Sequence, residues 1–150
     1  MELLIKQLEV LQKFDINKII SDILQDSTFQ KWILDLVRWE QLYNKGIRGD
    51  GLSLGDYAPL SLQLKKDRQL DHITLRETGE FYNTFAIKIN ASDFIIDADS
   101  TGKEDYQGRN LFDRYDTMNG DLLGLTEENM EILQEKLTPL IINKLWDLIQ

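Results

Sequence analysis

Apolar residues recur at helical spacing through the first part of the chain. Leu4, Leu8 and Leu11 share one helical face. Two longer rows follow at the same spacing: Ile16, Ile19, Ile20, Ile23 and Leu24, then Phe29, Trp32, Ile33, Leu36, Val37 and Tyr43. Polar residues occupy the opposite faces. We therefore predict that residues 3–45 are helical.

Local signals divide this helical region into segments. Asp15 is a good N-cap residue, and Phe14 and Ile19 flank it at the spacing of a hydrophobic staple. Ser27 and Gln30 have the spacing of a capping box, which predicts a second helix start. Gly46 is expected to end the last helix of the region.

Strand signals appear only in the middle of the chain. Residues 46–71 contain Gly49, Gly51, Gly55 and Pro59 and are predicted to form a long loop. Residues 72–99 are predicted to contain strands, beginning with the alternation at Ile73 and Leu75. Residues 86–89 and 94–99 are expected to pair as a hairpin, with Phe85, Ile87 and Ile89 on one face.

The corner before this hairpin has its own pattern. Phe81, Tyr82 and Phe85 have the spacing of one helical turn. Thr78 is expected to cap that turn, and Gly79 to permit a close approach of the backbone. Leu75, Phe81 and Phe85 would point inward, whereas Arg76 and Glu77 would face outward or toward a neighbouring subunit.

The C-terminal region is predicted to contain a loop followed by two helices. Residues 100–125 form the loop, and residues 126–149 are helical, with Thr126 as N-cap and Glu127 and Glu128 in the first turn. Pro139 is expected to start the second helix at its N1 position. The main apolar row contains Met130, Leu133, Leu137, Leu140, Ile141, Leu145 and Leu148.

A second apolar face in this region contains Ile142, Trp146 and Ile149. It indicates either a subunit contact or a helix in the centre of the core. A two-stranded hairpin is marginal alone and must pack on helices. We therefore predict one α+β domain over residues 1–150, in which N-terminal helices and a C-terminal helix pair cover a small antiparallel sheet with long loops.

Composition adds constraints on the class of protein. The chain has 150 residues, no cysteine and a net charge of −9. Disulfides and cysteine-ligated metals are excluded. The N-terminus does not resemble a signal peptide, and no apolar run reaches the roughly 20 residues of a bilayer span. We expect a soluble protein that is made in the cytoplasm and has no contact with a membrane.

The excess negative charge is concentrated in the C-terminal part. Residues 1–48 carry seven acids and seven bases, whereas residues 91–150 carry thirteen acids and five bases. An acidic surface suits a basic protein partner and repels DNA. The alternative is that the charge only keeps the protein in solution.

The sequence offers little support for catalysis. His72 is the single histidine, and its neighbour Asp71 would point to the opposite face of a strand. No nucleotide-binding glycine pattern is present. We therefore predict a protein that is not an enzyme, with no cofactor and no small-molecule substrate.

One segment resembles the start of a calcium loop. Asp97, Asp99, Thr101 and Gly102 follow the D-x-D-x-T-G pattern, but the twelfth position is Gly108, where a bidentate Glu is needed. We favour an Asx-rich turn at the end of a strand.

Several short motifs occur in a recognisable order. Asp50-Gly51 comes first, then Asp56-Tyr57-Ala58-Pro59, then Lys65-Lys66, and then residues 75–81 (LRETGEF) before the hairpin. Over roughly residues 46–135 this order resembles bacteriophage virion-morphogenesis proteins of the neck or tail-completion type. The similarity is to copies in phages and prophages of gut Bacteroidota, including crAss-like phages. The long acidic segment 100–120 departs from that pattern.

The resemblance implies a structural virion protein at the head-to-tail interface. Such a subunit would form a sixfold or twelvefold ring between portal and tail, touching other neck proteins and passively meeting DNA in the channel. The expected interaction residues are Asp50, Tyr57, Lys65, Lys66, Arg76, Glu77 and Trp146. The alternative function is an intracellular acidic module that sequesters a basic protein.

Overall fold

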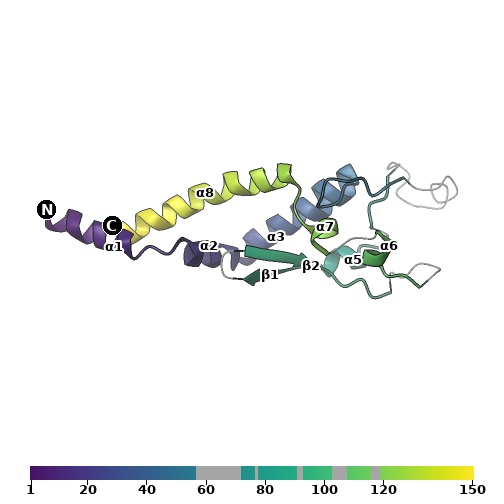
Figure 1. Ribbon diagram of the computed structural model, residues 1–150, viewed down its shortest axis with the longest axis horizontal. Helices are drawn as coiled ribbons and strands as arrows, with labels where there is room; N and C mark the ends of the chain where they lie inside the picture. The colour runs from purple at the N-terminus through teal and green to yellow at the C-terminus, as the bar shows by residue number, and fades with distance from the viewer. Residues whose placement is uncertain (57–71, 77, 91–92, 103–107, 116–118) are drawn as a thin grey trace.

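The computed structural model describes residues 1–56, 72–76, 78–90, 93–102, 108–115 and 119–150 (Figure 1). The molecule is elongated, and both termini lie at the same end. In chain order its helices are α1 (Glu2–Gln12), α2 (Ile16–Leu24), α3 (Ser27–Asp35), the π-helix η1 (Leu36–Lys45), α5 (Glu80–Asn83), α6 (Leu111–Arg114), α7 (Asn119–Leu123) and α8 (Glu127–Ile149). The strands β1 (Ala86–Asn90) and β2 (Asp93–Asp97) lie between α5 and α6. The predicted α+β class is confirmed.

The cap of α2 follows the sequence prediction, and that of α3 does not. The Asp15 carboxylate accepts the backbone N–H groups of Asn17 and Lys18. The predicted capping box at Ser27 is wrong, because Asp26 is the N-cap and accepts the N–H of Phe29. The side chain of Gln30 instead donates to the Leu24 carbonyl at 2.7 Å. A carboxylate one residue upstream displaces the hydroxyl as cap.

The helix that ends at Gly46 is a π-helix. Its buried residues are Leu36, Val37, Gln41 and Leu42. The two pairs are five positions apart, which matches the i→i+5 hydrogen bonding of this helix type. Gly46 ends the helix in a left-handed conformation, as predicted, with φ 62°.

The hairpin has the predicted faces. β1 and β2 are antiparallel, with Ala86 opposite Asp97 and Ile89 opposite Phe94. Ile87 and Ile89 are partly covered, whereas Lys88 and Asn90 are exposed. The helices supply the remaining cover, since α2 and α3 contact β1 and α7 contacts β2.

The corner before the hairpin differs in detail from the prediction. His72 makes one isolated bridge with Asp56, and Leu75 adopts a positive φ of 60°, so the described part of 72–76 contains no regular strand. Gly79 is the N-cap residue of α5 at φ 92°, whereas the Thr78 hydroxyl accepts the N–H of Glu80. The glycine therefore supplies a backbone conformation, not a close approach. Phe81 and Phe85 are buried as predicted, and Leu75 is half-buried.

The predicted C-terminal helix pair is one continuous helix. α8 runs from Glu127 to Ile149 with Pro139 inside it, and Thr126 caps it by accepting the N–H of Asn129. A proline removes one backbone hydrogen bond, yet tertiary packing can hold a helix together across that gap. The predicted loop 100–125 also needs correction, because α6 and α7 lie within it and bury Leu111, Leu122 and Leu123.

The core lies between α2, α3, η1, the hairpin, α7 and the first half of α8. Its fully buried side chains include Ile33, Val37, Leu42, Leu122 and Leu123. α1 contributes no buried residue. The end of the molecule that carries both termini therefore lies outside the core (Figure 1).

Candidate interaction surfaces

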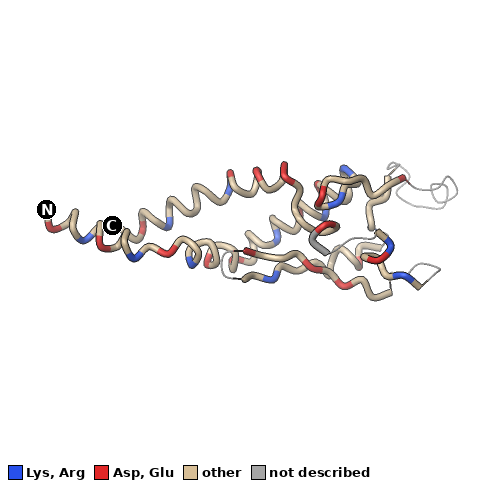
Figure 2. Tube along the Cα trace, viewed as in Figure 1, with Lys and Arg blue, Asp and Glu red and all other residues tan. Residues whose placement is uncertain are grey.

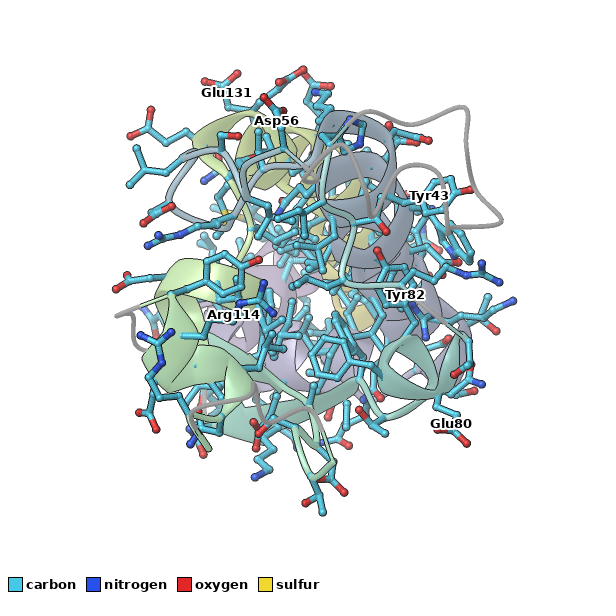
Figure 3. All side chains as sticks on the ribbon, turned by 90° about the vertical axis from the view of Figure 1, so that its right-hand side faces the viewer. Tyr43, Asp56, Glu80, Tyr82, Arg114 and Glu131 are labelled. Atoms are coloured by element: carbon cyan, nitrogen blue, oxygen red, sulfur yellow. The ribbon has the colours of Figure 1, made fainter. Side chains whose placement is uncertain are left out.

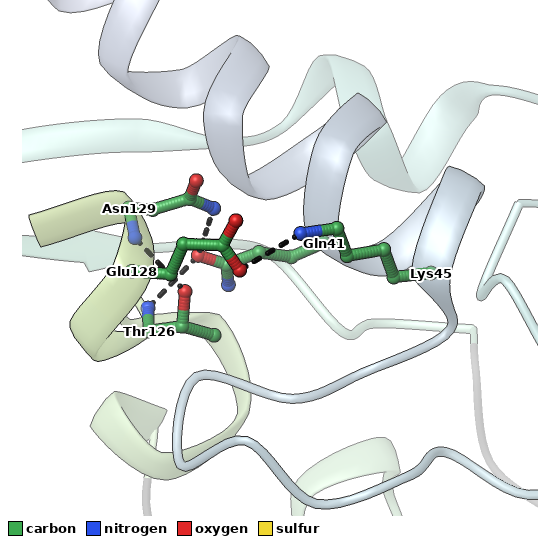
Figure 4. Close-up of polar contacts among 5 residues, drawn as sticks. All are labelled: Gln41, Lys45, Thr126, Glu128 and Asn129. Carbon is green, nitrogen blue, oxygen red and sulfur yellow. Dashed lines mark hydrogen bonds and ion pairs between the residues drawn. The ribbon is translucent and has the colours of Figure 1, made fainter. Parts of the chain in front are cut away.

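A buried glutamine fixes the start of α8. The Gln41 side chain donates to the Gly124 carbonyl at 2.9 Å. Its oxygen accepts the backbone N–H of Thr126 at 2.9 Å and the side-chain amide of Asn129 at 2.8 Å. Lys45, one turn further along η1, pairs with Glu128 at 3.0 Å (Figure 4). Since Gln41 is 0% exposed, each of its three hydrogen bonds is costly to lose.

The segment after η1 rests on α7. Gly49 and Asp50 donate their backbone N–H groups to the carbonyls of Leu122 and Asp121, at 3.1 and 3.0 Å. A Cβ at Gly49 would overlap the carbonyl oxygen of Gly124 and lie 2.7 Å from its nitrogen. Only a glycine at position 49 permits this approach of two backbones.

Asp50, a predicted interaction residue, has a structural role in this turn. Its carboxylate pairs with Arg48 at 2.6 Å and accepts the N–H of Leu52 at 3.1 Å. These contacts close the turn around Gly51, whose φ is 85°. The carboxylate thus already has two partners within its own loop.

Arg76, predicted to face outward, lies against aromatic rings of its own chain. Its guanidinium stands 5.6 Å from the Trp39 ring centroid and 6.0 Å from that of Tyr43. Trp39 also meets Tyr82 edge to face, at 5.6 Å. Tyr43 and Tyr82 lie on the same side of the molecule in Figure 3. The half-buried arginine therefore stabilises this corner through cation–π contacts.

His72 is part of the same structural corner. Its Nε2 lies 2.7 Å from the Tyr43 carbonyl, which can only accept, so this nitrogen carries the proton. The imidazole ring covers Gly46, where a Cβ would lie 2.7 Å from the ring carbon Cγ. These contacts give the histidine a structural role in the corner.

The segment that resembles the start of a calcium loop forms an Asx turn, as predicted. Asp99 accepts the Thr101 N–H at 2.9 Å, and Asp97 pairs with Lys88 at 2.9 Å. Hydrogen bonds from the Thr101 hydroxyl and backbone hold the pKa of the Asp99 carboxyl below its usual value of 3.8. The described residues contain no group of three or more His, Asp or Glu side chains suited to a metal ion.

Trp146, by contrast, is exposed at the terminal end. This end comprises residues 1–13 and 142–150, which we call the arm. Its two helices are joined by a hydrogen bond of 3.2 Å from the Gln7 side chain to the Ile149 carbonyl. Nine of the fifteen exposed large apolar side chains in the described part of the chain lie here: Met1, Leu3, Leu4, Ile5, Leu8, Leu11, Ile142, Trp146 and Leu148. Such a concentration is typical of a surface that another protein covers.

An apolar groove lies beside the first half of α8. It has a volume of about 480 Å³, and α2, β2, residues 124–125 and α8 form its walls. Leu24, Ile96 and Leu133 form its floor, whereas Met130 and Ile95 are exposed at its rim. Four consecutive β2 residues, 93–96, line it, so the groove runs along a strand edge.

Charge separates the arm from the rest of the molecule. The arm carries Glu2, Glu9 and Asp147 against Lys6, Lys13 and Lys144, which sum to zero. The whole net charge of −9 therefore belongs to the remainder. Figure 2 shows acidic positions following one another along the first turns of α8, and both signs mixed in the arm.

The remaining predicted interaction residues are Tyr57, Lys65, Lys66 and Glu77, and they lie outside the described residues. Sequence reasoning missed Gln41 and Gly49. Gln41 had one available signal, a polar residue set within an apolar helical row. Gly49 had none, because its partner Gly124 is 75 positions away.

No family model matches the sequence, and searches of curated proteins and of solved structures find no match. None of the helices among the described residues combines the length and apolarity that a bilayer span requires.

Proposed function

We propose that this protein is a structural subunit that works by assembling with other proteins, as a ring component of the phage neck between portal and tail. The observation that carries the proposal is the arm, where large apolar side chains lie exposed on two helices. Burying each of them fully would contribute about 1.5–3 kcal/mol, so covering the arm with another protein would favour association.

The chemistry of the described side chains agrees with a structural role. His72 is hydrogen-bonded to the Tyr43 carbonyl, Asp99 accepts a hydrogen bond within its own turn, and Asp97 forms an ion pair. The motif order over residues 46–135 resembles neck and tail-completion proteins and supplies the virion part of the proposal.

The test is assembly and location. Native mass spectrometry of the purified protein should give a sixfold or twelvefold species. Proteomics of intact particles should find the chain in virions, and cryo-EM should place its ring beside the portal. A protein that is monomeric and missing from virions would refute the proposal.

A second candidate is an acidic module that sequesters a basic protein. The observation that favours it is the row of exposed acids Glu127, Glu128, Glu131 and Glu135 on the first half of α8. Calorimetric titration with polylysine should then give salt-sensitive binding that Glu131→Lys combined with Glu135→Lys abolishes. Binding that ignores both substitutions would exclude this candidate.

A further inference from the structure

The arm and the groove differ in place and in orientation. Leu137 lines the groove, whereas Trp146 lies nine positions further along α8. At 3.6 residues per turn, nine positions rotate a side chain by about 180° around the helix. Ile142, five positions beyond Leu137, is rotated by about 140°. Ile142 and Trp146 therefore point away from the groove, whereas Leu148, 11 positions beyond Leu137, is rotated by about 20° and points to the groove side.

Two distinct apolar surfaces on one subunit suit head-to-tail assembly. A ring needs a heterologous contact, in which one patch of a subunit meets a different patch of the next. A volume of about 480 Å³ accommodates several side chains, although not a whole helix. A row of side chains from a neighbouring helix would fit such a space.

Charge favours a second copy of this chain over a basic protein as the occupant. Two subunits of net charge −9 repel each other unless they meet through a neutral surface. The arm has no net charge, and among the described residues Asp93 is the only ionisable side chain that lines the groove. A basic partner would instead be drawn to the glutamates on the first half of α8.

The arm is also only weakly stabilised within one subunit. α1 has 11 residues, none of them buried, and an isolated helix of that length is marginal in water. Its docking on α8 includes one side-chain hydrogen bond, from Gln7. A neighbouring subunit that covers the arm would supply the missing apolar contacts.

We propose that the arm of one copy, led by Ile142 and Trp146, inserts its apolar side chains into the groove between α2, β2 and α8 of the next copy. This inference rests on the ring assembly proposed above. It assigns the two faces of the subunit contact, and the contact repeats around the ring.

The test uses three full-length variants. Trp146→Ser combined with Ile142→Ser disables the arm, and Met130→Lys places a charge at the groove rim, where Met130 is 39% exposed. Ile132→Ser is the matched control, since Ile132 lies on the same helix with similar exposure, 38% against 46% for Ile142. Circular dichroism should show all three folded like the wild type.

Native mass spectrometry should find the arm variant and the groove variant monomeric, and the control assembled like the wild type. The decisive step is mixing. The intact arm of the groove variant should enter the intact groove of the arm variant, so an equimolar mixture should give a one-to-one heterodimer and nothing larger.

The outcomes separate the two proposals. If the groove variant still assembles alone, or the mixture stays monomeric, the arm-to-groove contact is wrong, although the ring remains. If the wild type is monomeric at every concentration and missing from virions, the ring proposal and this inference both fall. If the groove instead binds an extended segment that pairs with the edge of β2, the arm variant should still assemble, and the arm-to-groove contact would be wrong.

Discussion

The first turns of α8 and its last turns carry similar apolar side chains in opposite surroundings. At the start of the helix, Leu133 is buried and the Gln41 side chain holds the N-terminus in place. At the end, Trp146 is 55% exposed, and Gln7 of α1 makes a half-buried hydrogen bond to the Ile149 carbonyl. One helix thus joins a region that is complete within the subunit to a region that still lacks contacts.

The difference shows how stability and association can be separated along one element. The described residues outside the arm, which we call the body, are held together by the buried apolar core and by the long-range hydrogen bonds of Gln41, so the loss of these contacts acts on folding. Side chains of the arm contribute little to the isolated fold, and their loss should act on assembly. Substitutions at matched positions can test each half of this statement.

The largest effect is expected from Gln41→Ala compared with Gln7→Ala. The first variant leaves the Gly124 carbonyl, the Thr126 N–H and the Asn129 amide without their partner. We expect a loss of about 3–5 kcal/mol in the free energy of unfolding, since each unsatisfied buried group costs about 1–3 kcal/mol. Gln7→Ala should cost less than about 1 kcal/mol. Urea denaturation followed by circular dichroism measures both, and equal losses would contradict the comparison.

A smaller effect is expected from Gly49→Ala compared with Gly51→Ala. The new methyl group at position 49 meets the backbone of Gly124, and we expect overpacking to cost about 2–3 kcal/mol. At position 51 the methyl group meets nothing, so the cost is the positive φ alone, about 1 kcal/mol. Thermal unfolding of the two proteins gives this order, and the reverse order would show that residues 46–56 do not need α7.

Pro139→Ala should stabilise the part of α8 where the body meets the arm. Alanine is about 3 kcal/mol better than proline inside a helix, although packing already offsets part of that cost, so we expect a gain of about 1 kcal/mol. The restored N–H can donate to the Glu135 carbonyl. Amide hydrogen exchange should slow at residues 140–146 and stay unchanged in η1. Unchanged exchange at residues 140–146 would show that the proline does not limit the stability of this part of the helix.

The smallest effect concerns Asp99, which is fully exposed and should not matter to the body. In Thr101→Val the hydroxyl is lost, so the pKa of Asp99 should rise toward 3.8. A carboxyl whose pKa is lower in the folded state stabilises the protein above its unfolded pKa and loses that effect as the pH falls through the folded pKa. Carbon-detected NMR titration gives the pKa of wild type and variant, and identical values would remove the assigned cause.

Local chemistry explains which parts of the fold could be predicted. Asp15, Gly46 and Thr126 cap their helices through contacts with residues within five positions, so the sequence contains the whole signal. The faces of β1 follow from its alternation over five residues, whereas β2 has three consecutive apolar residues and its register comes from pairing with β1. Pro139 misled the prediction because the packing that keeps α8 continuous through it is not local.

Tertiary contacts explain what could not be predicted. Whether Leu4, Leu8 and Leu11 cover a core or remain exposed depends on what α1 packs against, and periodicity is the same in both cases. Arg76 was expected to point outward, since a charged residue usually does. The rings of Trp39 and Tyr43 that receive it come from a helix more than 30 positions earlier.

The hydrogen bond from Gln7 to Ile149 joins positions 142 residues apart. During translation, α1 therefore leaves the ribosome long before the helix it docks on. At about 5–20 residues per second, that interval is on the order of ten seconds. Throughout it, the leucines of α1 are available to chaperones. The arm forms only after both α1 and the end of α8 have been synthesised, so incomplete chains cannot assemble through it.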